Sequence, residues 1–222
     1  MKGFMPPNGF LPMPDIETAR SWYPQNDPVH GFDHILRVYR MAEHLADAEG
    51  ADIDIVRAAA LLHDAEGPGV EASREGHQYK SADLARQILA AEGWPEERIQ
   101  AVEHCIRAHR FRDEREQPQT LEAQVLFDAD KLDAIGAIGA VRAVAYAVLA
   151  EQPLHAVPSE QFIQTGRKEP GEPHTPYHEH LFKLSKLTGR MFTSTGRTLA
   201  RERHRVLDSF FEQWQAELQA ER

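Results

Sequence analysis

The spacing of apolar residues constrains the fold of this chain more than any other feature of its sequence. Apolar side chains recur three and four positions apart, which places them on one face of a helix. The clearest stripe consists of Ile35, Val38, Met41, Ala42 and Leu45. The sequence has no sustained alternation of apolar and polar residues rich in Val, Ile and Thr, which is typical of strands. The pattern predicts an all-α fold.

Prolines, glycines and capping residues divide this helical pattern into segments. The expected helices cover residues 15–22, from 30–32 to the break at Gly50, 52–64, 78–91, 95–108, 121–150, 177–192 and 196–220. We expect the helix over 121–150 to bend at Gly136 or Gly139. Residues 152–176 are rich in Pro, Gly and Thr and predict a long irregular loop.

A chain of 222 residues can bury a proper core and has the size of one large domain. We predict a single compact helical bundle with an additional C-terminal helical region. Its expected parts are an N-terminal extension (1–14), a helical core (15–150), a loop over or near the site (151–176) and C-terminal helices that pack on the core (177–222).

Charge and composition limit the classes of partner that the protein can be expected to bind. The formal net charge of −10 disfavours an extended nucleic-acid partner, because phosphate backbones are bound by clustered Lys and Arg. The apolar segment from Ala134 to Ala150 contains Arg142 and is shorter than the roughly 20 residues of a membrane-spanning helix. We interpret it as a buried, alanine-rich helix and expect no membrane partner. The lone Cys105 excludes an intrachain disulfide and fits a cytoplasmic protein.

Adjacent polar residues at the end of an apolar helix are the most unusual local feature. His63 and Asp64 follow a run of Ala and Leu, where buried polar groups need partners. A divalent metal is one such partner, and His34 lies beside the apolar stripe of the preceding helix. Carboxylates also enter the apolar helix downstream, at Asp128, Asp130 and Asp133. Imidazole and carboxylate together suit Mn, Fe, Co, Ni or Zn and are less decisive for Mg. This chemistry does not separate Asp128 from Asp130.

The order of these residues resembles a known family. His34 with Arg37-Val38, then His63-Asp64, then Ala129-Asp130-Lys131-Leu132 is similar to the H…HD…D signature of the HD-domain metal-dependent phosphohydrolases. From about residue 18 onward the chain resembles a bacterial subfamily of small stand-alone HD hydrolases that includes nucleoside triphosphate pyrophosphohydrolases. The resemblance implies an HD-domain helical bundle that holds one divalent ion through His34, His63, Asp64 and Asp130.

The resemblance also implies an activity. The expected substrate is a small phosphorylated molecule, with a nucleotide favoured and pyrophosphohydrolysis of nucleoside triphosphates preferred. A 5′-nucleotide monophosphatase and a sensor that binds nucleotide or metal without turnover are the alternatives, and the complete ligand set favours an enzyme. A divalent metal, manganese among the candidates, polarises the phosphoryl oxygen and activates water. A homodimer is a further hypothesis.

The positions of further residues relative to these ligands suggest catalytic and substrate-binding roles. We expect Asp64 and Glu66 to act on the attacking water, and Lys131 and His109 to assist catalysis. Cations that bind phosphate are expected at Arg37, Arg107, Arg110 and Lys131. Binuclear HD enzymes place extra ligands where this chain has His77 and His109, so a second metal is one interpretation. A surface His77 and a substrate-contacting His109 form the other, which we prefer.

Two carboxylates near the ligands and three histidines late in the chain are expected not to bind the metal directly. Asp128 and Asp133 are expected to support the ligands. His174, His178 and His180 are expected to be solvated loop histidines rather than a zinc site, because no cysteine and no paired ligand spacing accompanies them.

Overall fold

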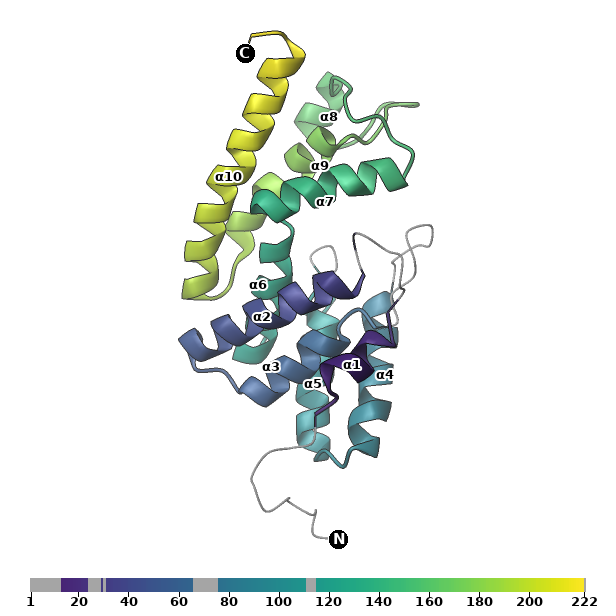
Figure 1. Ribbon diagram of the computed structural model, residues 1–222, viewed down its shortest axis with the longest axis vertical. Helices are drawn as coiled ribbons and strands as arrows, with labels where there is room; N and C mark the ends of the chain where they lie inside the picture. Colours follow the sequence, from purple (N-terminus) through teal and green to yellow (C-terminus); the bar gives the residue numbers. More distant parts are fainter. Residues whose placement is uncertain (1–12, 24–28, 30, 66–75, 111–114, 222) are drawn as a thin grey trace. The chain divides into compact units, whose positions relative to one another are not determined.

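The computed structural model describes residues 13–23, 29, 31–65, 76–110 and 115–221 (Figure 1). Every regular element within these residues is a helix, which confirms the all-α prediction. The elements are α1 (Ile16–Arg20), α2 (Phe32–Glu49), α3 (Ile53–Leu62), α4 (His77–Ala91), α5 (Glu96–Ala108), α6 (Leu121–Asp133), α7 (Gly136–Leu149), α8 (Glu160–Thr165), α9 (Pro176–Phe182), the 3₁₀ helix η1 (Leu184–Arg190) and α10 (Ser194–Leu218). Most of the expected N-terminal extension lies outside the described residues.

The expected helix over 121–150 is two helices. α6 ends at Asp133, and α7 begins at Gly136. Gly136 has a φ of +76°, a conformation that side-chain-bearing residues rarely adopt. A Cβ at this position would also lie 3.1 Å from the Cβ of Arg203. The bend predicted at Gly136 or Gly139 is therefore confirmed at Gly136, and it is sharp enough to separate two elements.

Two expectations about the C-terminal half are wrong in detail. The loop over 152–176 contains α8, whose first turn is capped by the Ser159 hydroxyl accepting from the Phe162 N–H at 3.0 Å. The helix expected over 177–192 is α9 followed by η1. The break falls at Lys183, whose φ and ψ of −126° and −55° leave the α-helical region.

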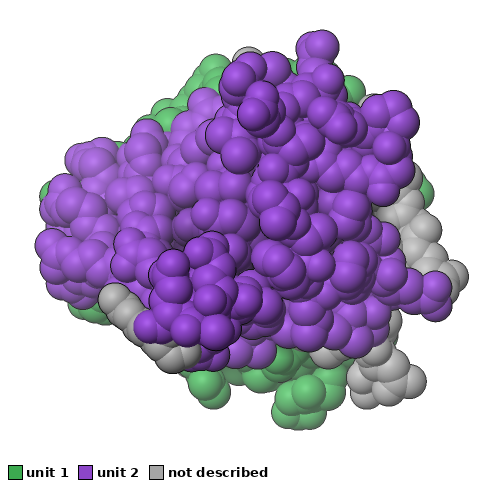
Figure 2. All heavy atoms as spheres, turned by 90° about the horizontal axis from the view of Figure 1, so that it is seen from above, with its two compact units in different colours: residues 1–130, 192–195 green, residues 131–191, 196–222 purple. Residues whose placement is uncertain are grey.

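Contacts within the chain divide it into two compact units. The first comprises residues 1–130 and 192–195, and the second comprises residues 131–191 and 196–222, as Figure 2 shows in green and purple. The division falls between Asp130 and Lys131, inside α6.

The first unit is built around α3. This helix packs against α2, α4 and α5. Its N-terminus is capped by Asp52, which accepts from the Asp54 and Ile55 N–H groups and pairs with Arg98 at 2.8 Å. The predicted stripe on α2 is confirmed as core at Ile35, Val38, Ala42 and Leu45, which are fully buried, whereas Met41 is half-buried at its edge.

The second unit contains α7, which packs against α9. One face of α7 is buried through Ala140, Ala143 and Ala147, whereas Val141 and Val148 are exposed. The expectation of a buried helix therefore holds for one face only. No single helix of the described residues has the length and apolar character to cross a membrane, although α6 and α7 pass that test together as a bent pair.

Candidate metal centre

Three predicted ligands come together in the first unit. His34 of α2, His63 at the end of α3 and Asp130 of α6 each offer a ligand atom, and these atoms lie within 4.8 Å of one another. His34 Nε2 is 3.5 Å from Asp130 Oδ1. The two imidazoles are 1% and 0% exposed. The apolar stripe of α2 and the Ala/Leu run of α3 thus bring these side chains into the core.

The orientation of His63 suits a metal ligand. Its Nδ1 lies 2.9 Å from the carbonyl oxygen of Ala60. A carbonyl only accepts hydrogen bonds, so Nδ1 carries the proton and Nε2 is left with a lone pair. This Nε2 is buried and has no hydrogen-bond partner among the described residues. A divalent cation would satisfy it, and the carbonyl would fix the ring as ligand-supporting groups do.

A second group adjoins the first. Asp64, His77 and His109 also offer ligand atoms within 4.8 Å of one another. Asp64 Oδ1 is 3.0 Å from His77 Nε2 and 3.6 Å from His109 Nε2. His77 is only 5% exposed, so the expectation of a surface position is wrong. His77 begins α4, and packing of α4 against α3 and α5 explains its burial.

His109 repeats the geometry of His63. Its Nδ1 is 2.6 Å from the carbonyl oxygen of Ile106, so its Nε2 lone pair is directed to the side of the ring that Asp64 occupies. An imidazole lone pair and a carboxylate oxygen repel each other unless a proton or a cation lies between them. The second group therefore also fits a divalent ion.

Ring contacts link the two groups. The centroid of His63 is 5.7 Å from that of His34 and 5.1 Å from that of His109. The centroid of His109 is in turn 5.4 Å from that of His77. The ligand set expected around one cation is thus divided, with Asp64 in the second group. Consecutive side chains leave a helical backbone about 100° apart, so His63 and Asp64 face different groups.

The carboxylates near Asp130 have other partners. Asp128 is fully buried and accepts from the Phe192 N–H at 2.9 Å, the Thr193 N–H at 2.8 Å and the Thr193 hydroxyl at 2.7 Å. It therefore anchors residues 192–193 to α6. Asp133 pairs with Arg142 at 2.8 Å within the second unit. The grouping of Asp130 with the two histidines supports Asp130 as the carboxylate ligand.

Two of the cations expected to bind phosphate are paired with carboxylates. Arg37 contacts Asp33 at 2.7 Å, and Arg107 contacts Glu116 at 2.8 Å. Hydrogen bonding to Glu116 raises the pKa of Arg107, so its charge is firmly held. Lys131 is buried and begins the second unit.

Two further residues were expected at the site. Arg110 follows α5 and is half-buried. Glu66 lies outside the described residues.

The two carbonyls that orient the imidazoles were not predicted from the sequence. Ala60 and Ile106 each precede a histidine by three positions, and each histidine is the C-cap of its helix. A histidine at a predicted helix end can donate to one of the last carbonyls, which lack helical partners. The position of His63 and His109 at the ends of predicted helices could therefore have indicated these hydrogen bonds.

Comparisons with known proteins find a family and several similar chains. A model of the HD domain family matches residues 31–135. The uncharacterized protein YpgQ of Bacillus subtilis is 30% identical over 192 residues, which cover 85% of this chain and 84% of YpgQ. The crystal structure of YpgQ in complex with ADP has a TM-score of 0.68 at 29% identity, and covers 91% of this chain and 97% of that structure.

Two further solved structures are similar. A Lactobacillus plantarum protein has a TM-score of 0.73 at 31% identity, with 92% of this chain and 95% of that structure covered. An HD-superfamily hydrolase from Bacillus thuringiensis has a TM-score of 0.65 at 27% identity, with 92% and 95% covered.

Proposed function

From the premise that the chain belongs to the HD-domain family and is a metal-dependent phosphohydrolase, we propose that its substrate is a nucleotide and that it releases pyrophosphate from nucleoside triphosphates. The observation that carries the proposal is the pair of adjoining groups, each with two buried imidazoles and one carboxylate. The ADP complex of YpgQ supports a nucleotide-type ligand.

The two groups assign the ligands. His34, His63 and Asp130 would hold one divalent ion, and Asp64, His77 and His109 would hold a second. Buried nitrogen and oxygen donors suit Mn, Fe, Co, Ni or Zn. When bound, such an ion polarises a phosphoryl oxygen and lowers the pKa of water to near neutrality. The carbonyl of Ala60 keeps His63 Nε2 facing the first position, and that of Ile106 does the same for His109 at the second.

Other residues would act on the attacking water or neutralise the charge of the phosphate. We assign Asp64 to orient the attacking water and to accept its proton on a carboxylate oxygen, and we propose Glu66 as a second acid for the same step. Arg37, Arg107, Arg110 and Lys131 would neutralise the phosphate oxygens, since phosphoryl transfer depends on positioning and electrostatic stabilisation.

The scissile bond distinguishes the candidate activities. In the proposed reaction the water oxygen forms a bond to the α-phosphorus, the bond from that phosphorus to the bridging oxygen breaks, and pyrophosphate leaves with a nucleoside monophosphate as the other product. A 5′-nucleotide monophosphatase would instead break the bond between phosphorus and the ribose oxygen and release inorganic phosphate.

The decisive experiment is a substrate panel. The purified protein is supplied in turn with Mn²⁺, Mg²⁺, Co²⁺ or Ni²⁺ and incubated with nucleoside mono-, di- and triphosphates, while phosphate, pyrophosphate and nucleoside products are followed by mass spectrometry. Equal amounts of pyrophosphate and nucleoside monophosphate support the proposal. Phosphate from monophosphates alone supports the monophosphatase, and tight nucleotide binding without any product supports the sensor.

A further inference from the structure

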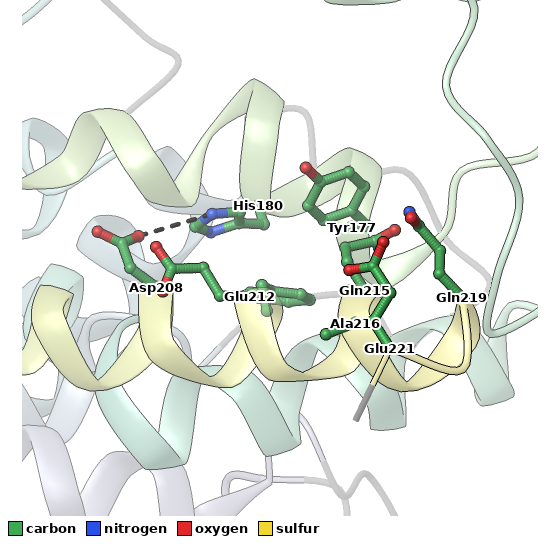
Figure 3. A pocket seen from close by; sticks show the side chains of 9 residues that line it. Tyr177, His180, Asp208, Glu212, Gln215, Ala216, Gln219 and Glu221 are labelled. Atoms are coloured by element: carbon green, nitrogen blue, oxygen red, sulfur yellow. Dashed lines mark ion pairs between the residues drawn. The ribbon is translucent and has the colours of Figure 1, made fainter.

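The second unit contains a pocket of its own, and none of the candidate metal ligands lines it. It has a volume of about 580 Å³ and lies between α9 and α10 (Figure 3). All of its lining residues belong to the second unit. Its histidine, His180, was expected to be solvated. It is only 8% exposed, which corrects that expectation. His178 is fully buried as well.

One wall of the pocket is aromatic. The ring of His180 stacks on that of Phe211, with centroids 4.4 Å apart and planes at 22°. The ring centroid of Tyr177 lies 6.1 Å from that of His180 and 6.0 Å from that of Phe211. Stacked rings of this kind offer an apolar surface and electron-rich faces, which attract cations.

The charge of the lining has one sign. Asp208, Glu212 and Glu221 each contribute a carboxylate, and the lining contains no Lys or Arg. Within the described part of the chain, the ion pairs of Asp208 are with His180 at 3.6 Å and His204 at 3.1 Å. Burial lowers the pKa of His180 and the neighbouring His204 adds to this, although Asp208 opposes it. His180 therefore adds little positive charge, and the lining is negative.

Two buried polar atoms in the lining lack partners. His180 Nδ1 has no hydrogen-bond partner among the described residues, and neither does Gln215 Nε2. Because His180 Nε2 faces Asp208, the neutral ring carries its proton there and Nδ1 is an acceptor. The Gln215 amide can turn either its donor or its acceptor end into the pocket. Buried polar atoms are normally satisfied, so both point to a bound polar ligand.

We propose that this pocket binds a small organic cation, with an ammonium or guanidinium group carried on an aliphatic or flat body. The cationic group donates to the carboxylates of Asp208 and Glu212 and to His180 Nδ1. The body lies against Tyr177 and Phe211. The negative lining repels phosphates, so the ligand class is distinct from the nucleotide proposed for the metal centre.

The test is calorimetric titration of the full-length, metal-loaded protein with agmatine, which carries both an ammonium and a guanidinium group. Butanediol serves as the uncharged comparison and succinate as the anionic one. We expect saturable binding of agmatine alone. Glu212 is exposed, so Glu212→Gln should fold normally and weaken agmatine binding several-fold. Combining it with Asp208→Asn should weaken binding by about tenfold or more.

A matched control separates the pocket from the general charge of the protein. Glu202 is an exposed acid on α10 outside the pocket lining, and Glu202→Gln should leave agmatine binding unchanged. Tyr177→Leu should weaken binding while circular dichroism shows the native helical signal. Absence of saturable binding, equal binding of butanediol, or equal weakening by Glu202→Gln and Glu212→Gln would each overturn the proposal.

Discussion

The imidazole rings of His63 and His109 lie 5.1 Å apart at an angle of 80°, and each ring is held by the carbonyl three positions before it. These two hydrogen bonds place the protons on the Nδ1 atoms and leave both Nε2 atoms as acceptors. One acceptor belongs to the group of His34 and Asp130, and the other belongs to the group of Asp64 and His77. The pair therefore joins two candidate metal positions.

Removal of a ligand should abolish function and leave the fold intact. His63→Ala removes a buried acceptor without placing a new polar group in the core, so the helical circular dichroism should be retained. We expect metal content and phosphohydrolase activity to fall together, with activity lost by more than about 100-fold, since even residues that only support ligands cost 10–100-fold. His44→Ala changes an exposed histidine of α2 and should have no effect. Full activity without bound metal would refute the assignment.

The second group should determine metal stoichiometry. We expect two divalent ions per chain in the wild-type protein at saturating metal and one in His77→Ala, because Asp64 and His109 alone form a poor site. Mass spectrometry of the native protein or elemental analysis after dialysis measures this ratio. A wild-type protein that binds one ion, with the same content in His77→Ala, would restrict metal binding to the first group.

Asp128 and Asp130 should respond differently to substitution. Asp128→Ala leaves the N–H groups of Phe192 and Thr193 without their acceptor, which should lower the free energy of unfolding by about 1–3 kcal/mol in urea titrations. Its metal content should be unchanged. Asp130→Ala should lose metal with a smaller effect on stability. The reverse pattern would show that Asp128 is the ligand.

Glu172 should make the second unit sensitive to acid. Partial burial raises its pKa, but hydrogen bonds from the backbone N–H groups of Ser159 and Glu169, the Ser159 hydroxyl and His178 outweigh this and lower the pKa from 4.5 to about 2. A carboxylate whose pKa is lower when folded stabilises the fold above its unfolded pKa. That stabilisation is complete above about pH 5 and is lost as the pH falls from there towards 2.

The measurement is acid unfolding followed by circular dichroism. Glu172→Gln should destabilise the protein at neutral pH and flatten the decline in stability between pH 5 and pH 2. Glu160→Gln, which changes an exposed acid of α8, is the control and should keep the wild-type slope. An unchanged slope in Glu172→Gln would contradict the role of this carboxylate.

Local patterns were sufficient to predict much of the fold and the main ligands. The stripe on α2 and the Ala/Leu run of α3 indicate both the helices and their buried faces, so His34 and His63 could be placed in the core from spacing alone. The chemistry of the residues did not distinguish Asp128 from Asp130 as the carboxylate ligand, and the family resemblance indicated Asp130. Its distinction from Asp128 depends on residues 192–193, which are far away in the sequence.

Long-range contacts explain what the sequence did not reveal. The glycines at 136 and 139 predicted a bend, but the choice of Gly136 and the complete separation of α6 from α7 involve its positive φ beside Arg203, which is far away in the sequence. The burial of His178 depends on Glu172, which lies 3.2 Å from its Nε2, and that of His180 depends on stacking with Phe211. A polar sequence around these histidines suggested solvent exposure, because their partners are contributed by other parts of the second unit.

The most direct test of the central claim is anomalous diffraction from crystals of the protein loaded with Mn²⁺. We predict a peak coordinated by His34, His63 and Asp130, and a second peak coordinated by Asp64, His77 and His109. Manganese bound elsewhere in the chain, with the Nε2 atom of His63 contacting only protein or water, would contradict the account.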